Sequence, residues 1–307
     1  MTFAIALMLV AGQPSVDTIA ERLRQAPLAA EQKAQIRKAL ESRDYRVAET
    51  ILVRAIDANP KSADLLVLAA RVFFVDNNPA NTAIALKKAE KIRPLNPDEK
   101  FTLSMAYIGI GKGAWARPEL EKLGAADPQN TLYPYWLARI DYDEHLYDAA
   151  IARLEVVTKS NPAFARGWDN LGLSFEGTGK LEAAVASYKE AVRLNRDQSP
   201  HSPWPPLNLG SLLTKMGDLK AAEELLREAA GYDPKLGEAH YRLGSNLHKQ
   251  GREEDAAAEL RLASEFDPSA TEPLYVLGQI YRLQGKPAEA DQVFERFKEL
   301  KKKRRGT

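Results

Sequence analysis

The chain of 307 residues carries 43 basic and 42 acidic side chains, for a formal net charge of +1. This balance gives no electrostatic reason to expect a nucleic acid or another polyanion as partner. The absence of cysteine excludes disulfides, thiolate catalysis, thiolate metal ligands and lipidation at a cysteine.

The first segment is an apolar run, Phe3–Ala11. It is too short to span a bilayer, which needs about 20 residues, but it fits the apolar core of a signal peptide, and Val10-Ala11-Gly12 offers small residues for cleavage. The basic segment that usually precedes such a core is absent. We expect residues 1–12 to be a signal peptide and the protein to be exported to the periplasm or another extracytoplasmic space. The alternative is an apolar segment packed on the first helical pair of a cytoplasmic protein.

Residues 13–28 are expected to form a separate N-terminal helix. The segment 15–26 has helical apolar spacing, Ser15 or Asp17 can cap its first turn, and Pro27 ends it. We expect this helix to shield the open face of the first helical pair.

A repeat of 34 residues follows. Leu209-Gly210, Leu243-Gly244 and Leu277-Gly278 are spaced by 34, and Leu171-Gly172 is an earlier copy. The glycine position is held farther back by Ala138, Ser104, Ala70 and Ile36. Twelve residues after each such position come Ala48, Thr82, Ala116, Ala150, Ala184, Ala222, Ala256 and Ala290. Self-similarity at this period indicates stacked helical pairs, none of which can bury its apolar face alone.

Each recurring position has a structural reason. Two helices approach closely where one offers a very small side chain, and we expect Gly172 to face Ala184. The turn between the helices needs a residue that tolerates the left-handed conformation. That position is held by Gly111, Gly179, Gly217, Gly251 and Gly285, and in other repeats by Asn77, Arg43 and His145. Prolines such as Pro234 and Pro268 end one pair and start the next.

Eight such repeats cover residues 29–304 and predict an all-α, right-handed α-solenoid of helix-turn-helix repeats. One insertion, at 199–202, lies in the proline-rich segment 197–206, which we expect to be an extended surface loop with Trp204 packed over the junction. The basic run Lys301–Arg305 ends the last helix, where its charge complements the helix dipole, and residues 305–307 close the tail.

This pattern resembles the tetratricopeptide-repeat family. The match is fullest in the fifth repeat, at Trp168, Leu171, Gly172, Phe175, Ala184, Tyr188 and Ala191. Arg196 stands there in place of the closing proline. The resemblance covers nearly the whole chain and implies a stack whose first helices line a concave groove for a protein or peptide partner.

No motif points to catalysis. The four histidines, His145, His201, His240 and His248, lack the spacing of metal ligands. The segment 141–145 is more typical of a solvated turn than of a cation site. The segment 109–113 lacks the ending of a phosphate-binding loop and follows a helix. We expect a protein that is not an enzyme and has no cofactor and no metal.

Spacing from the glycine position identifies the side chains expected in the groove. The predicted peptide-binding residues are Arg71, Phe74, Phe101, Met105, Tyr135, Arg139, Tyr142, Asn170, Asn208, Tyr241, Arg242, His248, Tyr275 and Arg282. Aromatic residues with arginine are typical of interaction hot spots. The alternative is that several of these rings pack between neighbouring helices.

Chaperone-binding members of the family hold a partner's terminal carboxylate with lysine, asparagine and arginine side chains. Asp169 and Glu238 stand where lysines are expected and would repel a carboxylate, which disfavours that mode. Asn170 and Asn208 resemble the start of an asparagine ladder, in which each amide donates to and accepts from a peptide backbone.

We therefore predict a non-catalytic interaction scaffold that binds a peptide segment or partner protein in its groove, in assembly or secretion at the cell envelope. An RNA-binding helical-repeat protein is an alternative, although the apolar groove and balanced charge argue against it. An enzyme with an unrecognised site is another, and it would need a pocket of convergent titratable groups.

Overall fold

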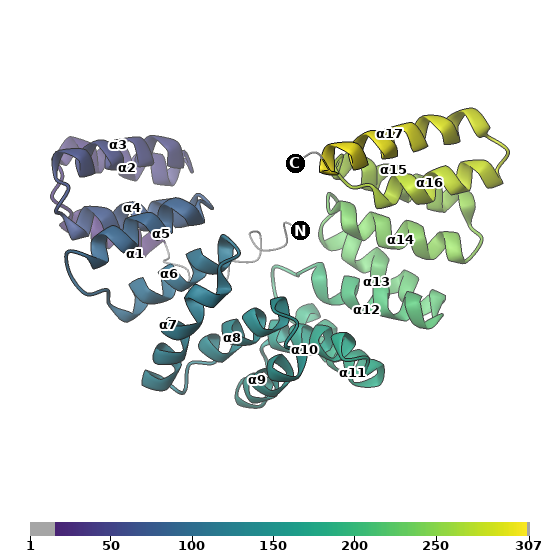
Figure 1. The fold of residues 1–307 in the computed structure, drawn as a ribbon, viewed down its shortest axis with the longest axis horizontal. Coiled ribbons are helices and arrows are strands. Elements are labelled where there is room, and N and C mark those ends of the chain that lie inside the picture. The colour runs from purple at the N-terminus through teal and green to yellow at the C-terminus, as the bar shows by residue number, and fades with distance from the viewer. Residues whose placement is uncertain (1–15, 306–307) are drawn as a thin grey trace. The chain divides into compact units, whose positions relative to one another are not determined.

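The computed structural model describes residues 16–305, in which every regular element is a helix (Figure 1). The helices are α1 Val16–Gln25, α2 Ala30–Glu41, α3 Tyr45–Ala58, α4 Ala63–Val75, α5 Pro79–Glu90, α6 Pro97–Gly109, α7 Gly113–Ala126, α8 Leu132–Asp143, α9 Tyr147–Ser160, α10 Ala165–Gly177, α11 Leu181–Arg196, α12 Trp204–Met216, α13 Leu219–Tyr232, α14 Gly237–Lys249, α15 Glu253–Phe266, α16 Glu272–Leu283 and α17 Pro287–Arg305. Within this range, none is both long enough and apolar enough to cross a bilayer.

After α1 the helices alternate as the first and second members of a repeat. We call the even-numbered helices α2 to α16 the A helices and the odd-numbered helices α3 to α17 the B helices. A and B pack as pairs, as in α4 with α5 and α14 with α15, and a B helix such as α13 or α15 also packs on the next A helix. The chain divides into an N-terminal unit, residues 1–153, and a C-terminal unit, residues 154–307. Figure 1 shows helical hairpins stacked in layers within each unit.

The turn between A and B adopts the left-handed conformation in every repeat that the spacing identified. Glycine holds it in five repeats, with φ between 70° and 92°. Arg43, Asn77 and His145 hold the same position at φ of 57°, 58° and 62°. Asparagine tolerates this conformation better than most residues with a Cβ, whereas arginine rarely adopts it, so Arg43 is held there by the repeat rather than by its own preference.

The close approach of A and B occurs at the glycine position, but against a different side chain from the one predicted. A Cβ added to Gly172 would lie 2.5 Å from the ring of Tyr188, and one added to Gly210 would lie 2.8 Å from Leu226. The predicted partner, Ala184, is fully buried nearby. The residue that needs the glycine is therefore Tyr188, one helical turn beyond the alanine.

In two A helices, α10 and α14, the ring nitrogen of a residue in the first turn contacts a carbonyl oxygen in the loop that precedes the helix. The indole of Trp168 donates to the carbonyl oxygen of Pro162 at 2.9 Å. His240, at the equivalent position, places Nε2 3.1 Å from the carbonyl oxygen of Pro234 and Nδ1 2.7 Å from Glu259. Both rings tie an A helix to the end of the previous B helix, so His240 has a structural role.

The inserted loop is bound to the helices on either side of it. The side chain of Asn195 donates to the Ser202 carbonyl oxygen and accepts from the Ser202 N–H. His201 stacks on Tyr232 with ring centroids 4.7 Å apart, and Trp204 packs against the buried cluster of the following repeats. These contacts hold the four extra residues as part of the junction between α11 and α12.

The N-terminal helix α1 lies against the A helices of the first two repeats, α2 and α4, rather than over the first pair alone. Its side chains Ile19, Leu23 and Ala26 are at most 3% exposed. Lys33 in α2 donates to the Arg24 carbonyl oxygen at 2.7 Å, and Arg22 pairs with Glu99 of α6 at 3.1 Å.

Candidate peptide-binding surface

Most of the predicted groove residues in the N-terminal unit are buried. The exposed fraction is 5% for Arg71, 8% for Phe74, 7% for Phe101, 4% for Met105 and 2% for Tyr135. These side chains are not presented to a partner in this structure.

Arg139 and Tyr142, from the same predicted set, are half-buried. Some of the rings in this unit pack against one another: Phe101 meets Tyr133 edge-on at 5.6 Å, and Tyr135 meets Trp136 at 5.3 Å. Phe101 of α6 thus packs against a ring of the next A helix, α8, whereas Tyr135 contacts its neighbour within α8.

The two asparagines in the C-terminal unit already have partners for their amide groups. Asn170 is buried and donates to the Arg166 carbonyl oxygen in its own helix at 2.8 Å. Asn208 donates to both oxygens of Asp169, at 3.0 and 3.1 Å, across from α12 to α10. Asp169 thus accepts a hydrogen bond from the amide of Asn208 in this structure.

The C-terminal unit instead presents aromatic and cationic side chains along α14, α16 and the start of the tail. Tyr275 is 47% exposed, and its ring lies 5.7 Å from that of Phe297. Arg282 is exposed, and His248, Tyr241 and Arg242 are half-buried. We call Tyr241, Arg242, Lys249, Tyr275, Arg282 and Lys301 the cation–aromatic surface.

Three cations of this surface are not held by carboxylates in the contacts that the structure records for them. Arg282 lies over the ring of Phe294 at 4.6 Å, and Lys301 lies over Phe297 at 4.9 Å. Lys249 donates to the Thr214 carbonyl oxygen at 3.3 Å. A cation over an aromatic face keeps its positive charge available to an anion.

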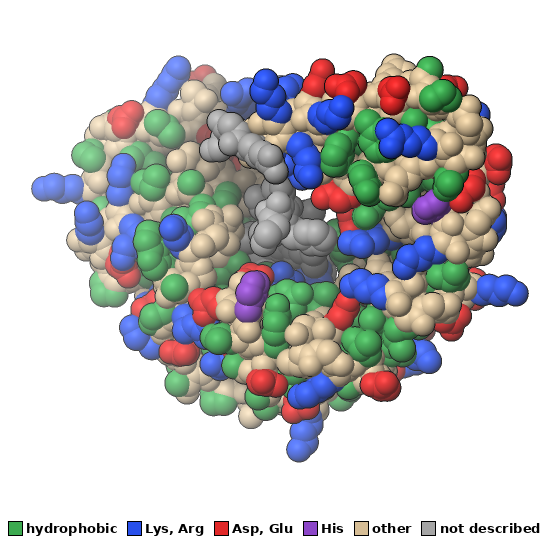
Figure 2. Space-filling model, turned by 45° about the vertical axis from the view of Figure 1, so that its right-hand side comes forward, with side chains coloured by type: hydrophobic (Ala, Val, Ile, Leu, Met, Phe, Trp, Pro, Cys, Tyr) green, Lys and Arg blue, Asp and Glu red, His purple; other side chains and the backbone are tan. Residues whose placement is uncertain are grey.

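Three carboxylates on α10, α14 and α15 are only partly exposed and are paired. Glu176 accepts from Lys215 at 2.6 Å, Glu238 accepts from Arg242 at 2.7 Å, and Glu253 lies 2.7 Å from His248. Their side chains are 22–34% exposed. These three carboxylates are therefore already paired, whereas Lys249, Arg282 and Lys301 are exposed. In Figure 2 the side formed by the C-terminal unit shows lysine and arginine side chains beside hydrophobic ones, with aspartate and glutamate side chains among them.

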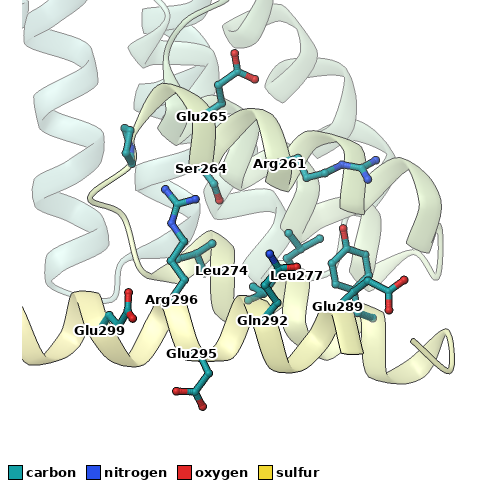
Figure 3. Close-up of a pocket in the computed structure, with 13 residues that line it drawn as sticks. Arg261, Ser264, Glu265, Leu274, Leu277, Glu289, Gln292, Glu295, Arg296 and Glu299 are labelled. Carbon is teal, nitrogen blue, oxygen red and sulfur yellow. The ribbon is translucent and has the colours of Figure 1, made fainter. Parts of the chain in front are cut away.

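The same unit has a cavity of about 770 Å³ between the B helices α15 and α17, with α16 at its base. In Figure 3 Arg296 of α17 and Ser264 of α15 point into this space, whereas Glu265 and Glu295 point away from it. Its rim carries both signs of charge, Arg261 and Arg296 with Glu289 and Glu299. It has neither the uniform charge nor the exposed rings of the cation–aromatic surface.

Burial raises the pKa of the Glu49 and Asp143 carboxyl groups, and the nearby Asp76 raises that of Glu49 further. Hydrogen bonding to Arg196 holds the pKa of Glu228 below its usual value against the effect of burial. Residues 16–305 contain no group of three or more histidine, aspartate or glutamate side chains placed to hold a metal ion.

Comparison with known families places tetratricopeptide repeats along most of the chain. One family model for the tetratricopeptide repeat matches residues 33–97 and 135–203, a second matches 177–247 and 213–273, and a third matches 274–306. These matches together span well over half of the 307 residues.

Known proteins share the fold at low identity. The BBSome complex member BBS4 of Bos taurus is 25% identical over 175 residues, which are 57% of this chain and 33% of that protein, so the chain spans about a third of this relative's length. Yeast Tom70 has a TM-score of 0.62 at 17% identity, over 92% of this chain and 65% of Tom70. PilW, a type IV pilus biogenesis factor, has a TM-score of 0.58 at 21% identity, over 64% of this chain and 90% of PilW. The two structural likenesses bear on the fold alone, and they confirm the all-α solenoid class.

Proposed function

The chain belongs to the tetratricopeptide-repeat family, and on that premise we propose that it is a non-catalytic scaffold that binds an acidic, extended segment of a partner protein on its cation–aromatic surface. Stacked helical repeats present extended surfaces that suit such segments. The observation that carries the proposal is the row of exposed cations and rings on α14, α16 and α17, beside carboxylates that are already paired.

The acidic character of the partner is inferred from charge complementarity. A carboxylate approaching Lys249, Arg282 or Lys301 need not displace a carboxylate that already pairs with that cation, so it does not first break an ion pair. Exposed charges of this kind mainly raise the association rate and make binding sensitive to salt. Tyr275, nearly half exposed, can supply the apolar contact that charge alone does not give.

The extended shape is inferred from the spacing of the surface. Tyr241 and Tyr275 lie at equivalent positions of successive A helices, and Lys301 lies beyond them on α17. A segment running across the A helices can meet these residues in turn, because equivalent positions of stacked repeats form a row.

Selection from a random peptide display library tests this proposal. We expect the wild-type protein to enrich acidic peptides with apolar residues, and we expect the enriched peptides to lose binding to the charge-reversed variant K249E/R282E/K301E. The matched control K189E/K220E/K235E reverses three exposed lysines outside the surface and should bind as the wild type does. Enrichment of peptides without acidic residues, or equal binding by both variants, would refute it.

RNA is the alternative ligand for this surface, because nucleic-acid bases stack on aromatic rings and phosphates bind cations. RNA binding must therefore be tested as well. Single-stranded RNA of mixed sequence, added to the wild-type protein at low salt, should show no binding that the charge-reversed variant loses. We keep export and a role at the cell envelope as part of the proposal, on the basis of residues 1–12, which lie outside the described residues.

A further inference from the structure

Helix α1 lies along the A-helix side of the N-terminal unit. It packs against α2 and α4, and its Arg22 reaches Glu99 in α6, so it meets three successive A helices. A helices line the inner face of a stack of such repeats. A helix that contacts one A helix after another therefore runs along that face.

Helix α1 covers part of the surface that the repeat spacing predicted to bind a ligand. Val67 and Arg71 lie three residues before and one residue after Ala70, which holds the glycine position of the second repeat. Val67 belongs to the same buried cluster as Ile19 and Leu23. Burial lowers the pKa of the Arg71 guanidinium, and the nearby positive charge of Arg22 lowers it further.

The contacts of α1 follow the pattern of a helix bound in a groove. Ile19 and Leu23 are four residues apart on one side of the helix, Ala26 follows three residues later, directly after the last helical residue, and all three are buried. Arg22, beside this apolar stripe, bonds to a carboxylate that is 1% exposed. Glu21 and Arg24, on the other side, are exposed.

Glu99, the buried carboxylate that Arg22 contacts, also has hydrogen-bond partners outside α1. Glu99 accepts two hydrogen bonds from Arg93, at 2.8 and 2.9 Å, and one from the Asn96 N–H at 3.1 Å. Burial favours a raised pKa for Glu99, but these bonds together with the charge of Arg22 outweigh it and hold the pKa below its usual value. Loss of Arg22 leaves this carboxylate paired, so departure of α1 does not strand a buried charge.

We propose that α1 is a ligand built into the chain, which occupies the A-helix side of the N-terminal unit until a partner's amphipathic helix of the same pattern displaces it. The partner helix carries apolar residues at positions i and i+4, a small residue at i+7, and an arginine at i+3 that pairs with Glu99. This site goes beyond the cation–aromatic surface, which lies on the C-terminal unit and takes an acidic segment.

Hydrogen exchange on the wild-type, full-length protein tests whether α1 detaches while its unit stays folded. We expect the amides of α1 to exchange at least about 100-fold faster than those in the middle of α4, because α1 opens separately. Equal exchange in α1 and α4 would overturn the proposal, since α1 would then open only when the whole unit unfolds.

Binding in trans tests the site itself. The probe is a fluorescent synthetic peptide of residues 15–27 with blocked ends, added to the full chain carrying I19D/L23D, which frees the site. We expect this variant to bind the peptide at least about tenfold more tightly than the wild type, whose site is filled. A peptide with Arg22→Glu should not bind. The control E21A/R24A, which alters exposed side chains of α1, should behave as the wild type.

Two results would overturn the proposal. A folded I19D/L23D variant that does not bind the peptide would show that α1 is not a ligand. Loss of exchange protection throughout α4 in that variant would show that α1 is a fixed part of the core. Neither result bears on acidic peptides at the C-terminal unit, so the two proposals can fail separately.

Discussion

Gly172→Ala is the substitution that tests the repeat packing most severely. The added Cβ would lie 2.5, 2.6 and 2.9 Å from three ring atoms of Tyr188, where carbon atoms normally approach to about 3.5–4.0 Å. Tyr188 is fully buried, and its hydroxyl donates to Glu176 at 3.1 Å, so the ring cannot tilt away without losing that bond.

The two opposing contributions can be estimated. Overpacking of a close-packed site costs up to about 3 kcal/mol, while alanine is favoured over glycine in a helix by about 1 kcal/mol. We therefore expect a net loss of up to about 2 kcal/mol in the free energy of unfolding. Gly231→Ala is the matched control, because a Cβ at that position, also helical, would meet nothing within 4 Å. It should raise stability by up to about 1 kcal/mol.

Urea unfolding followed by far-ultraviolet circular dichroism measures the difference between these two identical chemical changes. The Gly172 variant should unfold at a lower urea concentration than the wild type, and the Gly231 variant at the same or a higher one. Equal stabilisation by both would show that Tyr188 does not press on Gly172 and that the packing of the fifth repeat is wrong.

Three further outcomes are expected. Ala222→Leu, at a fully buried position beside the Gly210 approach, should cost about 1–3 kcal/mol in urea unfolding, and an unchanged midpoint would contradict the packing there. Arg43→Gly should raise stability by about 0.5–1 kcal/mol, because glycine adopts φ of 57° without the cost that arginine bears; a loss of stability would refute this. The hydrogen bond to Glu259 raises the pKa of His240 above 6.5 despite burial. The stabilisation from this pair is therefore complete below pH 6.5 and is lost as pH rises through the raised pKa. The melting temperature should fall more over that pH range in the wild type than in Glu259→Gln, and equal slopes would contradict the assignment.

The fold was largely predictable because each repeat restates the same local requirements. The left-handed turns at Arg43, Asn77 and His145 were found by position alone, although only one of these residues favours that conformation. The partner of Gly172 was not found, because spacing shows that a small residue is needed without showing which side chain of the B helix fills the space. That choice depends on how the two helices cross.

The candidate site was predicted less well. Spacing identified which face of an A helix points toward the groove, and it located Tyr275 and Arg282 correctly as exposed. It could not show that Asp169 would accept from the amide of Asn208, or that Arg22 of α1 would pair with Glu99 of α6, because both contacts join residues far apart in the sequence. The amphipathic pattern of residues 15–26 indicates one apolar face, but the helix could have placed that face elsewhere.

The loop at 197–206 and the missing proline at Arg196 show a related limit. Arg196 is the last residue of α11 and pairs with Glu228 on the next B helix. The helix therefore includes the position where the family pattern has its closing proline. The contacts of Asn195, Ser202 and His201 could not be read from a proline-rich segment. They depend on the position of α13, which the sequence does not specify locally.

Affinity capture from a native extract, followed by cross-linking and mass spectrometry, tests the central claim most directly. The wild type, the charge-reversed variant K249E/R282E/K301E and the control K189E/K220E/K235E are compared, each verified as helical. We expect the wild type and the control to capture the same protein through an acidic segment cross-linked near Lys249 or Lys301, and the charge-reversed variant to lose it. Equal capture by all three, or cross-links confined to the B helices α3 to α15, would contradict the claim that this surface is where the scaffold binds its partner.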